Sequence, residues 1–312
     1  MQDRFSIRNQ RTLRHSIGCV GIGLHTGARV ALTLHPGEAD SGIVFIRTDC
    51  VNGSGIRASH YNVGDTDLCT ALVDPAGNRI ATIEHLMAAL SICGIDNARV
   101  ELAGPEVPAM DGSAQPFVFL IECAGTEEQD RPRTVIRLNR AIEVQHGESL
   151  CKLVPAAERS LHCRIEFSSP HVGIQEISLA FEGDGLRHEL APARTFGFEA
   201  DVEALRARGL ARGGSLRNAV VIGEGGVLNG EGLRFADEFV RHKMLDAIGD
   251  LSLAGCVIEA RYVGIRPSHR LNNLLLRRLF EETSAFEVVH GELSRAAPPM
   301  RALPVPPVAL NS

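Results

Sequence analysis

The sequence predicts an α+β protein with two layered domains, and three observations lead to this prediction. A chain of 312 residues is longer than a single hydrophobic core usually supports, so two domains of roughly 150 residues are expected. Segments with strand periodicity and segments with helix periodicity alternate without the regular order of a parallel β-α-β sheet. A polar stretch at residues 125–132 separates two such mixed regions and is the best candidate for a linker.

The first region, residues 1–128, combines short strands with one helix. Residues 29–34 and 97–102 alternate between polar and apolar side chains, as half-buried strands do. Between them, apolar residues recur at helical spacing from Thr82 to Cys93. We expect a helix that is capped by the Thr82 side chain and ends at Gly94.

The second region, residues 129–300, contains more strands and the strongest helix of the chain. The expected strands are residues 150–154, 161–167 and 218–222, and the expected helices are residues 199–209, 235–254 and 271–282. Gly255 should close the helix at 235–254. The chain is rich in proline beyond Ala296, and residues 301–312 are expected to form a tail outside the folded domains.

Composition restricts the class of protein. A net charge of -6 disfavours a nucleic-acid-binding surface, which is normally basic. No apolar run approaches the ~18 residues that span a bilayer, and the N-terminus lacks the apolar core of a secretory signal. The 8 cysteines include no Cys-x-x-Cys pair, so we expect reduced thiols in a cytoplasmic protein. Any metal must then be bound by histidine and carboxylate side chains.

One polar stripe stands out on the helix at residues 235–254. His242, Asp246 and Asp250 follow one another at intervals of four residues, so a helix presents them on one side. A surface position or simple salt bridges would also explain such a stripe. However, the rest of that side is apolar, and burying three titratable groups is costly unless a metal or a closed network satisfies them.

A second pair, Glu84-His85, begins the helix predicted in the first region. By itself it would be read as an exposed polar pair. With His242 and Asp246, however, His85 completes two imidazoles and a carboxylate, a set that suits a catalytic Zn²⁺ with an open position for water. Glu84 is then placed to take a proton from that water. The chain lacks a His-Glu-x-x-His motif, so it is not a common metalloprotease.

Three further motifs are candidates for the site. His269 precedes the last helix; it is either a surface histidine or an acid that protonates a leaving amine, held charged by Asp250. Thr195 lies between a basic residue and two aromatics, either at a bent strand end or as a donor to an oxyanion. The glycines of residues 21–27 lack phosphate-loop spacing and are read as turn glycines, as is Gly112 in residues 111–114.

These residues resemble a known family, the UDP-3-O-acyl-N-acetylglucosamine deacetylases of Gram-negative bacteria. The resemblance covers about residues 10–285. The similar segments are residues 21–27, 82–86, 94–97, 110–114, 191–198 and 235–251. The last of these is the longest and the most specific.

The resemblance implies a cytoplasmic, zinc-dependent amidase that removes acetate from UDP-3-O-acyl-N-acetylglucosamine, the committed step of lipid A synthesis. The implied zinc ligands are His85, His242 and Asp246. The implied catalytic groups are Glu84 as general base, His269 as acid or electrostatic stabiliser, Asp250 as its partner and Thr195 as oxyanion donor. The implied substrate contacts are Phe167, Phe196, Phe198, Lys243 and Arg266, the last near the diphosphate.

The resemblance also implies an architecture. Two domains, each with helices packed on a sheet, should form a β-α-α-β sandwich with the active site at their interface. A βαβ insert at about residues 199–230 should form an apolar passage for the acyl chain. The chain departs from the family at Ser268, where a glycine usually precedes the acid histidine, and glycine is favoured where φ is positive.

Two other functions stay open at this point. The chain could be a zinc hydrolase of another acylated amine, or a metal-free module that binds a sugar nucleotide or RNA on the same fold. Imidazole and carboxylate ligands also accept Fe²⁺ in place of Zn²⁺. We expect a monomer that binds no nucleic acid and has no transmembrane segment.

Overall fold

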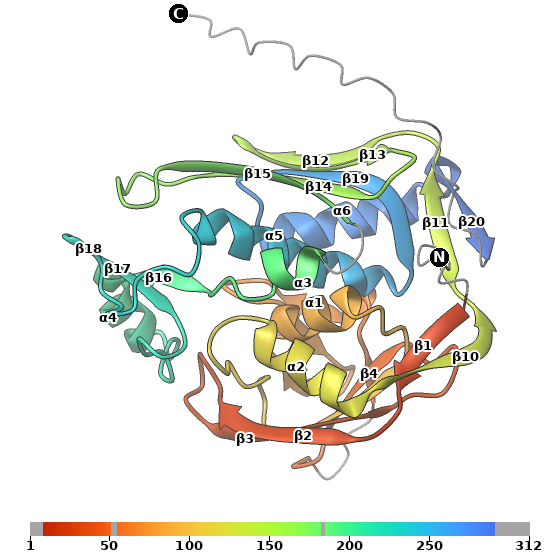
Figure 1. Cartoon of the computed structure of the whole chain (residues 1–312), viewed down its shortest axis with the longest axis horizontal. Helices are drawn as coiled ribbons and strands as arrows, with labels where there is room; N and C mark the ends of the chain where they lie inside the picture. Colours follow the sequence, from red (N-terminus) through yellow and green to blue (C-terminus); the bar gives the residue numbers. More distant parts are fainter. Residues whose placement is uncertain (1–8, 51–54, 182–184, 291–312) are drawn as a thin grey trace, which may run out of the picture.

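The computed structural model describes residues 9–50, 55–181 and 185–290. It forms four layers in the order sheet, helices, helices, sheet (Figure 1). This confirms both the α+β class and the β-α-α-β sandwich. The Pro-rich tail at residues 301–312 lies outside the described residues.

The first outer layer is a five-stranded sheet. Its strands, in spatial order, are β2 (Ile17–Ile22), β3 (Arg29–Pro36), β9 (Ala98–Ala103), β4 (Ile43–Arg47) and β5 (Ile56–Arg57). Helices α1 (Glu84–Ile92) and α2 (Gln115–Ala124) lie over this sheet (Figure 1). The strands predicted at residues 29–34 and 97–102 are therefore confirmed as β3 and β9. A small sheet of β6 (Val63–Asp65), β7 (Ala71–Val73) and β8 (Arg79–Ile80) leads into α1.

The second outer layer is a seven-stranded sheet. Its strands are β11 (Thr134–Leu138), β12 (Ile142–His146), β13 (Ser149–Pro155), β14 (Ser160–Glu166), β15 (Ile174–Ala180), β19 (Val257–Ile265) and β20 (Phe286–His290). Strand β19 is its centre, because it pairs with β11, β13 and β14. Helices α5 (Glu238–Leu251) and α6 (His269–Glu281) lie on its inner side (Figure 1).

The polar stretch expected to be a linker is a strand instead. Strand β10 (Thr126–Pro132) connects the two halves of the chain and pairs antiparallel with β1 (Asn9–Leu13). Most side chains of β10 are exposed, because a two-stranded ribbon has little core to face. Its polar composition therefore reflects exposure, and backbone pairing with β1 determines its conformation.

The segment predicted to be a βαβ insert contains two parallel strands joined by a helix. Strands β16 (Phe196–Phe198) and β17 (Val220–Gly223) run parallel, with α4 (Glu199–Ala207) between them, and β18 (Gly226–Val227) adds a third strand. The unit extends from one end of the sandwich (Figure 1) and begins at Phe196, slightly before the predicted boundary at residue 199. A short helix, α3 (Gly185–Glu189), precedes it.

The predicted start of α1 is wrong, although its end is confirmed. Helix α1 begins at Glu84, and no side chain caps its N-terminus. Thr82 instead has a left-handed backbone, φ 58°, and its hydroxyl donates to the buried carboxylate of Glu106. The chain leaves the helix at Gly94, which has φ 70°.

The predicted end of the helix at residues 235–254 agrees with the structure, whereas α6 begins two residues before its predicted start at Leu271. Gly255, with φ 69°, closes the 3₁₀ turn that follows α5. Helix α6 begins at His269, and the Ser268 hydroxyl accepts a hydrogen bond from the Leu271 N–H at 3.3 Å. Ser268 is extended, with φ -141°. No positive φ is needed there, so the serine replaces the family glycine without strain and caps the helix.

The two helical layers touch most closely where α1 crosses α5. A Cβ atom added to Gly249 would lie 2.1 Å from the carbonyl oxygen of Glu84. Leu86 and Leu245 are fully buried around this crossing. The absence of a side chain at Gly249 therefore allows the two helices to pack in direct backbone contact.

Replacing Gly249 by alanine tests this packing. Alanine favours a helix by about 1 kcal/mol over glycine, but the new Cβ atom can be accommodated only if two buried helices move apart. Overpacking a core typically costs about 1–3 kcal/mol, and here the obstacle is backbone. We expect Gly249→Ala to lower the free energy of unfolding by about 2 kcal/mol in urea denaturation. Gly225→Ala is the matched control, since its added Cβ meets nothing within 4 Å. Equal stability of the two variants would contradict the proposed close packing.

Candidate metal centre and active site

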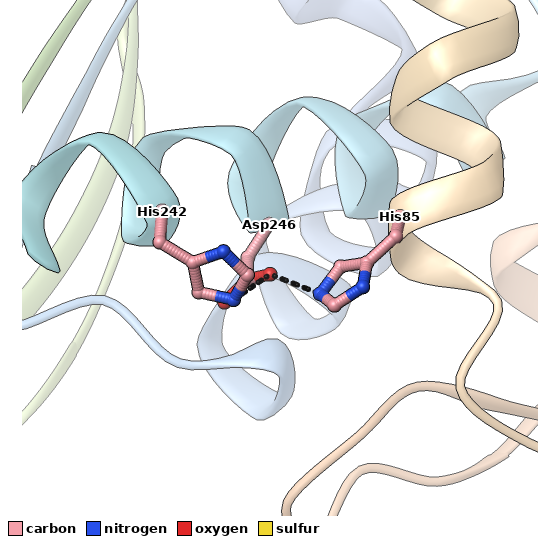
Figure 2. Close-up of side chains that lie close together, drawn as sticks. All are labelled: His85, His242 and Asp246. Atoms are coloured by element: carbon pink, nitrogen blue, oxygen red, sulfur yellow. Dashed lines mark ion pairs between the residues drawn. The ribbon is translucent and has the colours of Figure 1, made fainter. Parts of the chain in front are cut away.

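Three predicted metal ligands converge between α1 and α5. His85 lies in the first turn of α1, and His242 and Asp246 lie one turn apart on α5 (Figure 2). Each residue offers a ligand atom within 4.8 Å of the others, and all three side chains are buried. Within the described residues, this is the one group of three or more potential metal ligands. It contains no cysteine.

The geometry of this cluster fits a metal ion better than it fits hydrogen bonds. Asp246 Oδ1 lies 3.5 Å from His85 Nε2 and 3.4 Å from His242 Nε2 (Figure 2). These separations exceed a good hydrogen bond, and this buried oxygen has no hydrogen-bond partner. Two ligands of a tetrahedral zinc ion with bonds of about 2.0–2.1 Å are separated by roughly 3.3 Å. The donor set therefore fits Zn²⁺ and leaves a coordination position for another group.

Neighbouring groups orient the side chains of His242 and Asp246 and influence their protonation. His242 Nδ1 lies 3.0 Å from the carbonyl oxygen of Ala193, which orients Nε2 toward the cluster. Burial lowers the pKa of His242 to about 4, so the imidazole is neutral at neutral pH, as a metal ligand must be. Lys243 Nζ donates to Asp246 Oδ2 at 2.8 Å. This contact occupies one carboxylate oxygen and leaves Oδ1 facing the histidines.

A candidate acid–base pair lies beside the cluster. Glu84 Oε1 is 4.0 Å from His269 Nε2, and His269 Nδ1 is 2.9 Å from Asp250 Oδ2. Burial alone would lower the pKa of His269, but the carboxylates of Asp250 and Glu84 raise it to about 9. His269 is thus charged at neutral pH and can donate from Nε2. Burial raises the pKa of Glu84 above its ordinary value, which makes this carboxylate a better proton acceptor.

Thr70 links these groups and was missed by sequence reasoning. Its backbone N–H donates to Glu84 Oε2 at 3.0 Å, and its hydroxyl donates to Asp250 Oδ1 at 2.6 Å. Nothing in the local sequence of Thr70 signals this role, because Asp250 is distant in the chain. Asn272 also donates to Asp250, at 2.9 Å. It lies three residues after His269 on α6, so helical spacing could have revealed it.

A cavity of about 490 Å³ contains the cluster. Ten of the residues predicted for the site line it, namely Glu84, His85, Phe167, Thr195, Phe196, His242, Lys243, Asp246, Arg266 and His269. Asp250 does not line the cavity, because it lies behind His269. Phe198 is also outside the lining and packs against Phe167, with ring centroids 5.8 Å apart.

The cavity has an apolar wall and a polar rim. The Phe167 and Phe196 rings meet edge to face at 5.6 Å, and Phe196 packs on Phe239 at 4.8 Å. On the rim, Arg266 forms ion pairs with Glu166, at 3.0 Å, and with Glu148. An anionic group that binds Arg266 must therefore share it with these glutamates.

The glycine-rich loop at residues 21–27 also reaches the cavity. Gly27 has φ 69°, which supports the interpretation of turn glycines. The sequence did not reveal that Leu24 and His25 line the cavity. The buried Glu106 carboxylate holds the loop by accepting from the N–H groups of His25 and Thr26, both at 2.8 Å. Gly23 is required there, since an added Cβ would lie 2.4 Å from Glu106 Oε2.

Arg194 fixes the segment that carries Thr195. Its guanidinium donates from Nε to Glu238 Oε1 at 2.8 Å, and its backbone N–H donates to the same oxygen at 2.9 Å. Both side chains are buried. Because Glu238 begins α5, this pair attaches the Thr195 segment to the helix that carries His242.

The eight cysteines are free in the structure. In the described ranges, no helix is long and apolar enough to cross a membrane.

Comparison with known proteins gives one family. A family model described as UDP-3-O-acyl N-acetylglycosamine deacetylase matches residues 10–281. Three similar proteins carry the name UDP-3-O-acyl-N-acetylglucosamine deacetylase. The one from Myxococcus xanthus is 48% identical over 286 residues, covering 92% of this chain and 91% of that protein. The one from Pseudomonas entomophila is 47% identical over 291 residues, covering 93% and 96%. The one from Shewanella violacea is 43% identical over 297 residues, covering 95% and 97%.

The Arg194–Glu238 pair should make stability depend on pH. Burial opposes ionisation of Glu238, but hydrogen bonds from Arg194 lower its pKa below the ordinary value. Its contribution is therefore present above the unfolded-state pKa of about 4.3 and is lost as pH falls through the folded-state pKa. In urea denaturation, Glu238→Gln should be less stable than the parent by about 2–3 kcal/mol at pH 7. The difference should shrink below about pH 4.

Glu231→Gln is the control for this experiment. Glu231 also pairs with Arg194, at 2.8 Å, but its side chain is 61% exposed. Its replacement should have a much smaller effect at every pH. If the loss of unfolding free energy in Glu238→Gln stayed constant from pH 7 to pH 3, the charge on Glu238 would not contribute to stability.

Proposed function

This chain belongs to the UDP-3-O-acyl-N-acetylglucosamine deacetylase family, and we propose that it removes the acetyl group from a UDP-3-O-acyl-N-acetylglucosamine with Zn²⁺ bound by His85, His242 and Asp246. The products are the free glucosamine amine and acetate. This reaction commits the substrate to lipid A synthesis.

The main observation behind this proposal is that one carboxylate oxygen of Asp246, Oδ1, is buried without a hydrogen-bond partner. It lies between two imidazole nitrogens at the spacing that a tetrahedral ion requires. A purely structural cluster would leave this buried atom unsatisfied, which is costly. The neighbouring Glu84 and His269 supply the proton acceptor and the proton donor that hydrolysis of an amide needs.

Each residue has a distinct task in the proposed reaction. Zn²⁺ at this site supplies Lewis-acid chemistry, because it acidifies water and polarises a carbonyl group. Glu84 accepts a proton from the attacking water at its carboxylate. The Thr195 hydroxyl donates to the oxygen that becomes negative as the acetamide carbonyl is attacked. His269 donates its Nε2 proton to the leaving amine, and Asp250 keeps that imidazole charged and oriented.

The cavity also accounts for the other parts of the proposed substrate. The edge-to-face rings of Phe167 and Phe196 offer an apolar wall to the acyl chain, and the insert extends this side of the molecule. Lys243 and Arg266 supply positive charge for the polar head, with Arg266 nearest to the diphosphate. We further propose that the protein acts as a monomer in the cytoplasm.

Metal analysis combined with a deacetylation assay tests the ligands and the base together. The parent should bind one Zn²⁺ per chain, and His85→Ala and Asp246→Ala should lose both the metal and acetate release. Glu84→Ala should keep the metal, because Glu84 is not a ligand, yet lose about 10²–10⁴ in kcat.

Two results would count against these assignments. Loss of zinc from folded Glu84→Ala would mean that Glu84 acts as a ligand instead of a base. A parent that holds no stoichiometric metal, yet binds the sugar nucleotide, would support the metal-free binding module.

Thr70→Val tests the network behind the acid. Valine keeps the shape of threonine and the backbone N–H bond to Glu84, but it removes the hydroxyl that donates to Asp250. We expect kcat to fall about tenfold, since one hydrogen bond to a charged group contributes about 1.5–3 kcal/mol, while zinc content and KM stay unchanged. Thr70→Ser, which keeps the hydroxyl, should recover most of the rate. An equal loss in both variants would indicate a packing effect.

A further inference from the structure

Tyr262 carries a buried hydroxyl group that the reaction described above does not use. The residue is 2% exposed and lies on β19, the central strand of the seven-stranded sheet. Burial raises the pKa of Tyr262 well above its usual value, so the phenol keeps its proton. A buried tyrosine hydroxyl needs a hydrogen-bond partner. It has one on α6, because it donates to Asn272 Oδ1 at 2.7 Å.

Asn272 connects this hydroxyl group to the candidate acid. While its amide oxygen accepts from Tyr262, its Nδ2 donates to Asp250 Oδ2 at 2.9 Å. The same carboxylate oxygen lies 2.9 Å from His269 Nδ1. An asparagine amide has one accepting oxygen and one donating NH₂ group. A donor fixed at the oxygen therefore determines the direction in which the NH₂ group points.

Small residues around the phenol leave room for it. A Cβ atom added to Gly264 would lie 2.7 Å from the Tyr262 hydroxyl oxygen. Gly264 pairs in register with Cys151 on β13 and with Cys163 on β14, and both cysteines are buried. Cys151 Sγ lies 3.4 Å from the hydroxyl oxygen. The sheet therefore encloses the hydroxyl group and holds it at Asn272.

The carboxylate of Asp250 is thus restrained at both oxygens. Thr70 donates to Oδ1 at 2.6 Å, and Asn272 donates to Oδ2. The Asn272 side chain could turn away from Asp250 if its own oxygen lacked a donor. Tyr262 prevents this rotation, and consecutive hydrogen bonds in a buried chain also strengthen one another.

We propose that Tyr262 is a positioning residue for deacetylation, whose hydroxyl group fixes the Asn272 amide so that Asp250 holds the His269 imidazole toward the leaving amine. Tyr262 does not line the active-site cavity, so it acts through these groups and not on the substrate. The inference rests on the proposed function, because Tyr262 has a task only in the step in which His269 donates a proton.

Tyr262→Phe tests the proposal, since it removes the hydroxyl group and keeps the ring. In the zinc-loaded, full-length protein, kcat should fall about fivefold, the effect of one neutral hydrogen bond, while KM and zinc content stay unchanged. The His269 Nδ1 proton, followed by NMR after labelling with ¹⁵N-histidine, should exchange with water several times faster, because its acceptor is less restrained. Tyr61→Phe is the matched control. Tyr61 is the other of the 2 tyrosines and is 72% exposed, so its replacement should change neither quantity.

A second background separates positioning from packing. In Asn272→Ala, the added replacement Tyr262→Phe should cause no further loss of kcat, since the hydroxyl group then has no amide to hold. An equal loss in both backgrounds would overturn the inference. An active parent whose kcat or Nδ1 proton exchange is unchanged by Tyr262→Phe would also overturn it and leave the proposed function intact. A parent that releases no acetate would overturn the proposed function, and this inference with it.

Discussion

The direct backbone contact between α1 and α5 is the constraint on which the active site depends. Glycine at position 249 lets α5 approach the carbonyl of Glu84, so the first turn of α1 lies against the last turn of α5. As a result, His85 from one half of the chain meets His242 and Asp246 from the other. A side chain at the crossing would separate these groups by more than the tolerance of a metal site, in which bond lengths vary by only about 0.2 Å.

Burying several charged groups costs free energy, and a network of hydrogen bonds and ion pairs between them offsets this cost. Asp250 accepts from Thr70 and Asn272 and pairs with His269, so each of its oxygens is satisfied. Asp246 differs, because one of its oxygens is left for another partner. This contrast between two carboxylates on one helix supports the roles proposed for them, Asp250 as the group that orients the acid and Asp246 as a metal ligand.

The sequence predicted the layered fold more reliably than it predicted local details, and most of the residues predicted for the site line one cavity. Regular spacing revealed the stripe on α5, and the need for a third metal ligand and a base linked it to Glu84 and His85. The hydropathy pattern did not predict strand β10, because an exposed two-stranded ribbon has no apolar face. Thr82 was expected to cap α1, but it has a left-handed backbone and its hydroxyl donates to Glu106. Thr70 could not be found, since its partners come close only in the folded chain.

X-ray absorption spectroscopy of the zinc-loaded protein tests the central claim most directly, because it reports the atoms around the ion. Convergence of His85, His242 and Asp246 predicts a first shell of nitrogen and oxygen only, at about 2.0–2.1 Å, with the scattering pattern of two imidazoles. A sulfur ligand at about 2.3 Å, or a single imidazole, would show that zinc is bound elsewhere and would contradict the account.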